Sequence, residues 1–159
     1  MKRRSFLIAL ALSSISCRPV LLRYVQVDNP ANRLLLVTIV ESTDQVAYLN
    51  DPEVAALSAR YRYVPIVLNC EFSLADDRRY WANNYLSVSF EYYMKHRNCP
   101  FSDRDWDIVN DLAVTSTPEF RIYSADGSQL LRSIAASAED ERTIAQLRQF
   151  LVVAEASRN

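Results

Sequence analysis

Two cysteines and one histidine in the middle of the chain are the residue types best suited to chemistry. Cys70 and Cys99 flank a polar, aromatic stretch, and His96 is the only histidine of the chain. Thiolate, imidazole and thioether groups suit Cu(I), so Cys70, His96 and Cys99, with Met94 nearby, are a candidate copper-binding set. The same two thiols are also candidates for thiol–disulfide redox chemistry, or for a structural disulfide.

Composition excludes several other functions. Gly127 is the single glycine, so no glycine-rich phosphate loop can form and we expect no nucleotide. Catalysis by clustered histidines is excluded as well, because the chain has one histidine. The net charge is −1 and both signs of charge are interspersed, so we expect no nucleic-acid partner. No motif in the sequence predicts a bound cofactor.

The N-terminal residues have the three parts of a secretory signal. Three consecutive cations at residues 2–4 precede an apolar run at residues 6–12, and small residues follow. The run is too short to cross a hydrocarbon core of about 30 Å. The sequence therefore predicts a signal peptide over residues 1–16 and an exported protein.

The end of this segment, Ser14-Ile15-Ser16-Cys17, resembles the lipobox of bacterial lipoproteins. The resemblance implies that Cys17 is lipidated and becomes the first residue after cleavage; otherwise Cys17 is an ordinary residue beyond a simpler cleavage site. Because Arg18 rather than Asp follows, the resemblance implies the periplasmic face of the outer membrane. The segment Arg3-Arg4-Ser5-Phe6-Leu7 is also similar to the twin-arginine export motif, and either export route fits the sequence.

Assignment of Cys17 to lipid leaves Cys70 and Cys99 as an even pair in an oxidising compartment. Pairs of this kind most often form disulfides. We therefore predict a Cys70–Cys99 disulfide, which requires a Cα separation of about 4.4–6.8 Å. A redox role would need an accessible thiol of low pKa instead, and a copper site would need both thiols free.

The hydrophobic pattern predicts alternating strands and helices. Residues 17–32 are predicted to be the lipidated N-terminus and a tether, with a short strand at residues 21–27. The apolar run at residues 33–40 predicts a strand buried on both faces. A helical pattern follows at residues 46–61 and is kinked or restarted at Pro52. Residues 63–69 are predicted to be a second buried strand, parallel to the first.

The second half of the chain begins with a helical insertion at about residues 73–102. One helical stretch is expected from Asp76 through Met94, ending near Pro100, and a short helix should begin at Ser102 or Asp103. Residues 119–123 alternate like a strand exposed on one face. The remaining expected elements are an Asp-Gly hairpin turn at 124–128, a strand at 129–134 and an amphipathic helix at 139–154.

This order of elements resembles the thioredoxin-like family. The segment LAVTSTPEFRIY at residues 112–123, followed by Asp126-Gly127, is similar to the cis-proline strand and hairpin of that family, and PEVAALSARY at residues 52–61 to part of its first helix. The resemblance implies a three-layer α/β/α domain over residues 33–154 with a mixed central sheet and the helical insertion. It also implies that Pro118 is cis and that Thr117 and Pro118 form a peptide-binding surface.

The expected active-site motif is absent. The family carries Cys-x-x-Cys between its first core strand and first helix, whereas this chain has Ser42-Thr43-Asp44-Gln45-Val46 there. We therefore expect no thiol–disulfide exchange of the family kind, and read Ser42 or Thr43 as a helix cap. The resemblance then implies a redox-inactive protein that binds another envelope protein. The aromatic residues of the insertion either serve that interface or pack the insertion onto the sheet; they are Tyr80, Trp81, Tyr85, Tyr92 and Tyr93.

Overall fold

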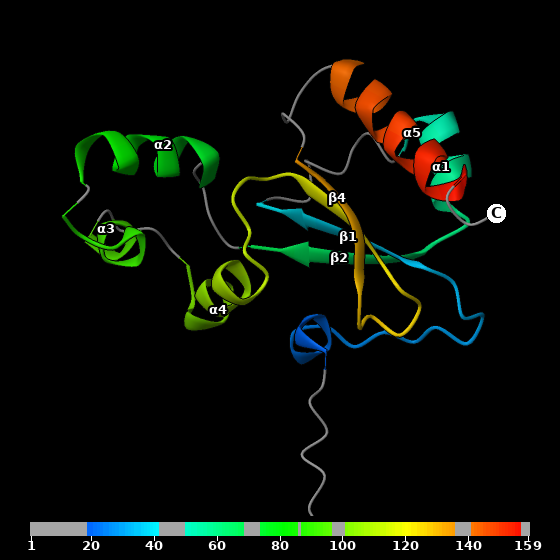
Figure 1. Cartoon of the computed structure of the whole chain (residues 1–159), viewed down its shortest axis with the longest axis horizontal. Coiled ribbons are helices and arrows are strands. Elements are labelled where there is room, and N and C mark those ends of the chain that lie inside the picture. The colour runs from blue at the N-terminus through cyan, green and yellow to red at the C-terminus, as the bar shows by residue number, and fades with distance from the viewer. Residues whose placement is uncertain are drawn as a thin grey trace, which may run out of the picture.

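The structure is a computed structural model of the chain, and it describes residues 19–41, 50–68, 74–85, 87–96, 101–135 and 141–156. Figure 1 shows the arrangement of its elements. In chain order they are η1 (Val20–Arg23), β1 (Leu35–Val40), α1 (Pro52–Ser58), β2 (Arg62–Val67), α2 (Leu74–Asn84), α3 (Phe90–His96), α4 (Asp103–Asp111), β3 (Glu119–Tyr123), β4 (Leu130–Ala135) and α5 (Glu141–Ala156). None of the helices formed by the described residues is long and apolar enough to cross a membrane.

The strands form one mixed sheet in the order β2-β1-β3-β4. β1 pairs in parallel with β2, from Leu35 opposite Arg62 to Val40 opposite Val67. β3 runs antiparallel to both β1 and β4. The predicted parallel pair is therefore confirmed, and the chain is a mixed α/β protein.

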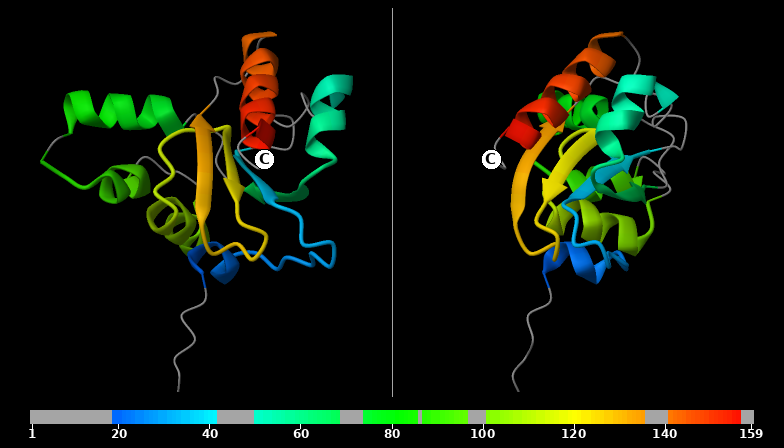
Figure 2. Two further views of the ribbon diagram at one scale, coloured as in Figure 1. Left: turned by 45° about the vertical axis from the view of Figure 1, so that its right-hand side comes forward. Right: turned by 90° about the vertical axis from the view of Figure 1, so that its right-hand side faces the viewer.

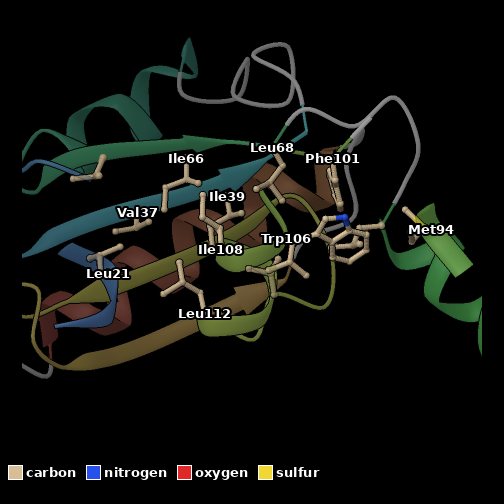
Figure 3. Packing of buried hydrophobic residues seen from close by; sticks show 14 of the residues in the cluster. Leu21, Val37, Ile39, Ile66, Leu68, Met94, Phe101, Trp106, Ile108 and Leu112 are labelled. Atoms are coloured by element: carbon tan, nitrogen blue, oxygen red, sulfur yellow. The ribbon is translucent and has the colours of Figure 1, made fainter. Parts of the chain in front are cut away.

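Two apolar clusters cover opposite faces of this sheet. Val37 of β1 belongs to a cluster with Leu21 of η1 and Ile108 of α4. Its neighbour Leu36 belongs to a second cluster with Leu147 of α5. This division follows from the alternation of side chains along a strand. Thus α4 and η1 lie on one face and α1 and α5 on the other (Figures 1 and 2), and Figure 3 shows the packing on the α4 face.

Helix α1 begins at a strong local signal. The Asp51 carboxylate accepts hydrogen bonds from the backbone N–H groups of Glu53 and Val54 at 3.1 and 3.0 Å, and Pro52 occupies the first helical position. Arg148 of α5 binds the same carboxylate at 2.8 Å and holds the pKa of Asp51 below its ordinary value. The described helix therefore begins after Asp51, where the sequence predicted either a kink or a new start; residues 42–49 lie outside the described part.

Helix α4 has capping motifs at both ends. At the start of the helix Ser102 and Asp105 form a reciprocal capping box. At the other end Ala113 adopts a left-handed conformation with φ of 50°, and the N–H of Val114 donates to the carbonyl of Val109 at 2.9 Å. This is a Schellman ending in which alanine stands where glycine is usual.

The predicted hairpin turn between β3 and β4 is confirmed. Gly127 has φ of 71°, and its N–H donates to the Ser124 carbonyl at 2.8 Å. The Asp126 carboxylate accepts hydrogen bonds from the Ser124 hydroxyl and from Ser128, which lowers the pKa of Asp126 to about 2. The single glycine of the chain thus occupies a position that needs a positive φ.

The predicted strand at residues 21–27 is wrong. The chain forms the 3-10 helix η1 instead, with Leu21 buried in the core. The Tyr24 hydroxyl donates to the Asp111 carboxylate of α4, which raises the pKa of Tyr24 to about 12, and Arg104 donates to the Tyr24 carbonyl at 3.3 Å. Part of the segment expected to be a tether is therefore packed on the domain, because its apolar residues fill the sheet face beside α4.

Burial of two strands also differs from the prediction. β2 is exposed on one face, with Pro65 and Val67 open to solvent. It is an edge strand, which is where a sheet tolerates a proline such as Pro65. β3 is buried at all five positions rather than exposed on one face. β3 lies inside the sheet, and helices cover both faces there, so even Glu119 and Arg121 are buried.

The insertion forms two helices rather than one continuous stretch. α2 ends at Asn84 and α3 begins at Phe90. The indole N–H of Trp81 in α2 donates to the carbonyl of Val88, which precedes α3, at 2.9 Å. This hydrogen bond holds the two helices together across their connection. The predicted stop near Pro100 lies outside the described residues, whereas the predicted start of α4 at Ser102 or Asp103 is confirmed.

Candidate functional site

The loop between α4 and β3 carries the predicted cis-proline. The peptide bond between Thr117 and Pro118 is cis, as the resemblance implied. Both side chains are buried, with Thr117 8% exposed. The hydroxyl oxygens of Ser116 and Thr117 and the Oε2 atom of Glu119 are buried and have no hydrogen-bond partner within the described ranges. The loop therefore holds buried polar groups that a partner could reach only if the loop opened.

A buried ion pair supports this loop from the sheet. The Arg121 Nε atom lies 2.7 Å from Glu119 Oε1, and Arg121 Nη1 donates to the Leu112 carbonyl at 2.6 Å. Burial acts to lower the pKa of Arg121, but hydrogen bonding to Glu119 and the Glu119 charge raise it above its ordinary value. Arg121 thus links the end of α4 to β3. Alternate charged residues in a predicted strand were the available signal for this pair.

Arg78 connects the insertion to the same loop. Its Nη2 atom donates to the Val114 carbonyl at 3.0 Å, and its guanidinium lies 4.4 Å above the centre of the Phe90 ring. The side chain is half-buried, and burial lowers the pKa of Arg78. α2 is thereby fixed beside the cis-proline loop. Nothing in the sequence pattern around Arg78 singles out this contact.

A groove rich in tyrosine lies on the α2–α3 segment. Its volume is about 950 Å³. Tyr80, Tyr85 and Tyr92 line it and are 52%, 42% and 52% exposed, while Tyr93 lines it from a buried position. We call this feature the tyrosine groove; Asp76, Asp77, Arg79, Asn83, Val88 and His96 complete its lining. Of the five aromatic residues proposed for an interface, three are therefore displayed, and Trp81 and Tyr93 pack inward instead.

The tyrosine rings of the groove lie close together. The ring centres of Tyr85 and Tyr93 are 5.1 Å apart, and those of Tyr80 and Tyr85 are 5.9 Å apart. Burial, together with the neighbouring phenols of Tyr80 and Tyr85, raises the pKa of Tyr93. At the rim the rings of Tyr92 and His96 are in contact, with centres 3.8 Å apart and planes tilted by 31°. Rigid rings with polar tips are the residue type most favoured in protein interfaces.

The predicted cysteine sites cannot be placed. Cys17, Cys70 and Cys99 all lie outside the described residues. The lipid anchor, the Cys70–Cys99 disulfide, the redox pair and the copper set therefore stay predictions. Ser42 and Thr43, the predicted helix cap, also lie outside the described part, and the described helix is capped by Asp51.

The structure separates the two described members of the copper set. Met94 is fully buried in the apolar cluster of α4, whereas His96 is exposed. Residues two positions apart on α3 point to different sides of the helix. His96 Nδ1 lies 2.9 Å from the carbonyl oxygen of Tyr92. Within the described ranges, no group of three histidine, cysteine or acidic residues could hold a metal ion.

Comparison with known proteins assigns no family to this chain. No protein-family model, no curated protein and no solved structure matches it. The fold alone defines a mixed α/β protein in which helices α2 and α3 lie at one side of the sheet.

Proposed function

We propose that this chain is an exported lipoprotein whose thioredoxin-like domain binds another cell-envelope protein without dithiol chemistry. Cys17 carries the lipid, and residues 1–16 are the signal that is removed. The domain lies at the periplasmic face of the outer membrane. Its function is to bind and position the partner protein rather than to catalyse a reaction.

Sheet topology supports the thioredoxin-like part of the proposal. A parallel strand–helix–strand unit, an antiparallel hairpin and a final helix are the parts that the resemblance implies, and the sheet order β2-β1-β3-β4 brings them together. The cis bond before Pro118 stands at the start of β3, where the resemblance requires it. The absence of cysteine from residues 41–69 supports a role other than dithiol exchange.

The tyrosine groove supports the protein-binding part of the proposal. Tyr80, Tyr85 and Tyr92 are each more than two-fifths exposed around one hollow, although aromatic side chains of this size normally contribute to burial. Arg78 fixes α2 beside the cis-proline loop. The groove therefore lies on a helix that is attached to the segment preceding that loop.

A redox role for Cys70 and Cys99, or copper binding by these residues with His96, is the alternative. Titration of free thiols in the exported protein, with and without reductant and Cu(I), separates the three readings. A stable disulfide agrees with the binding role. A readily reduced pair favours the redox role, and stoichiometric copper uptake by free thiols favours the metal site.

Photo-crosslinking tests the binding role directly. A benzophenone amino acid replaces Tyr92 at the rim of the groove, and in a matched control it replaces Val152 of α5, which is 49% exposed. We expect one discrete adduct with an envelope protein from position 92 and none from position 152. The substitution Tyr85→Ser should remove the adduct from position 92.

Two outcomes contradict the proposal. Equal adducts from positions 92 and 152 would mean that contact is not specific to the groove. No adduct from position 92 in cells that carry the lipidated protein would mean that the groove does not bind a protein.

A further inference from the structure

The anchor residue and the folded domain are almost contiguous in the chain. Pro19 is the first described residue, and its carbonyl accepts a hydrogen bond from the Leu22 N–H of η1 at 2.9 Å. Cys17 is two positions before Pro19. Two residues span at most about 7 Å even when fully extended. Any lipid on Cys17 therefore starts within about 7 Å of the folded domain, whatever the conformation between them.

The element beside the anchor is held firmly on the domain. Leu21 is 1% exposed and lies in the same cluster as Val37 and Ile108. The hydrogen bond from Tyr24 to Asp111 joins this segment to α4. η1 therefore cannot swing away without opening the core. It lies on the sheet face opposite α1 and α5, and no described element extends beyond it at that end (Figures 1 and 2).

The surface around η1 displays apolar side chains. Val20 is 37% exposed, and Leu130 and Leu131 at the start of β4 are 44% and 43% exposed. The Leu22 side chain lies against Gly127, so η1 contacts the turn that leads into β4. Exposed apolar residues next to an acyl anchor are what a surface on lipid headgroups requires. We call Val20, Leu130 and Leu131 the anchor-side surface.

We propose that the anchor-side surface rests directly on the lipid surface, so that the membrane fixes the orientation of the domain, with α1 and α5 pointing away from it. This inference rests on the lipidation of Cys17 in the proposed function. The sheet and its helices form layers about 10 Å apart. α5 should therefore lie about 20 Å further from the membrane than η1. The tyrosine groove then projects sideways rather than into the lipid.

Lysine labelling can measure this orientation. Lys95 is the only lysine after the predicted signal peptide. In a Lys95→Arg background, one new lysine is introduced either by Gln129→Lys beside the anchor-side surface or by Ala145→Lys on α5, both at exposed positions. The full-length lipidated proteins are labelled with an amine-reactive fluorophore. They are then reconstituted in phosphatidylethanolamine–phosphatidylglycerol vesicles with a quencher attached to the headgroups, and Lys95→Arg alone gives the background.

We expect the label at position 129 to be quenched several-fold more strongly than the label at position 145. Inserting a glycine–serine linker of about 20 residues between Arg18 and Pro19, with a mean span of about 25 Å, should abolish this difference. Leu131→Glu should reduce it, while Val152→Glu, at a comparably exposed residue of α5, should leave it unchanged.

The outcomes separate this inference from the proposed function. Equal quenching at positions 129 and 145 in a lipidated, vesicle-bound protein overturns the fixed orientation and leaves the lipoprotein role intact. A mature protein in which mass spectrometry finds Cys17 unmodified overturns both. Stronger quenching at 145 than at 129 would mean that the opposite face meets the lipid.

Discussion

The central strands of the sheet and the α2–α3 segment differ in how far their large side chains are buried. All six residues of β1 are buried, and in β3 even the charged Glu119 and Arg121 are buried and paired. In the α2–α3 segment large aromatic side chains remain open to solvent, among them Tyr80, Tyr85 and Tyr92. In Figure 1 these two helices project from one side of the sheet rather than covering it.

This difference indicates a division between stability and recognition. Opening the sheet costs much free energy because helices pack on both of its faces. Its buried residues are therefore not available to contact a partner protein. The exposed rings of α2–α3 contribute less to the fold and are free to be buried by another molecule. Substitutions in the two regions should therefore separate stability from binding.

The largest loss of stability should follow Arg121→Ala. This change leaves the Glu119 carboxylate buried without its cation and the Leu112 carbonyl without its donor. Loss of one partner of a buried pair costs about 3–5 kcal/mol, measurable by denaturant unfolding followed by circular dichroism. The double change Glu119→Leu with Arg121→Met should restore most of that stability. A loss below about 1 kcal/mol for the single change would show that water reaches the pair.

Leu36→Ala should have the next largest effect. Leu36 of β1 is fully buried in the cluster between the sheet and α5, so the change creates a cavity. We expect a loss of about 3 kcal/mol in the free energy of unfolding. Leu131→Ala on the exposed start of β4 is the matched control and should change stability much less. Equal effects of the two would mean that α5 does not pack on the sheet as described.

A gain in stability is expected from Ala113→Gly. Ala113 has φ of 50° at the end of α4, a conformation that glycine adopts without steric cost. Relief of the left-handed penalty, about 1–2 kcal/mol, exceeds the entropy cost of glycine, so the free energy of unfolding should rise by about 0.5–1 kcal/mol. Ala55→Gly within α1 should lower it by a similar amount, since helical glycine is unfavourable. A loss of stability from Ala113→Gly would contradict the left-handed ending of α4.

The smallest change in stability is expected from Tyr85→Ser. Tyr85 follows the end of α2 and is 42% exposed. Surface changes of this kind usually stay within about 0.5 kcal/mol. Partner binding, measured by the crosslink from position 92, should nevertheless be lost. If the α2–α3 segment unfolds in this variant, its tyrosines contribute to stability as well as to binding, and the proposed division is wrong.

Local signals in the sequence determined the boundaries of several elements. Asp51 with Pro52, Ser102 with Asp105, and Asp126 with Gly127 act within a few residues of the chain, so a helix start or a turn can be read from them directly. The apolar run of β1 predicted burial on both faces for the same reason, since it needs no knowledge of its neighbours.

Burial and contact between distant segments were decided only by the tertiary structure. Residues 119–123 alternate like a half-exposed strand, but their position inside the sheet buries all of them. Arg121 donates to the carbonyls of Leu112 and Ala113, which directly follow α4. Leu21 became a core residue because a sheet face beside α4 was open to it. The sequence pattern did not distinguish the buried Tyr93 from the exposed Tyr80, Tyr85 and Tyr92 of the α2–α3 segment. Such properties depend on what lies across from a residue, and a pattern along the chain does not contain that information.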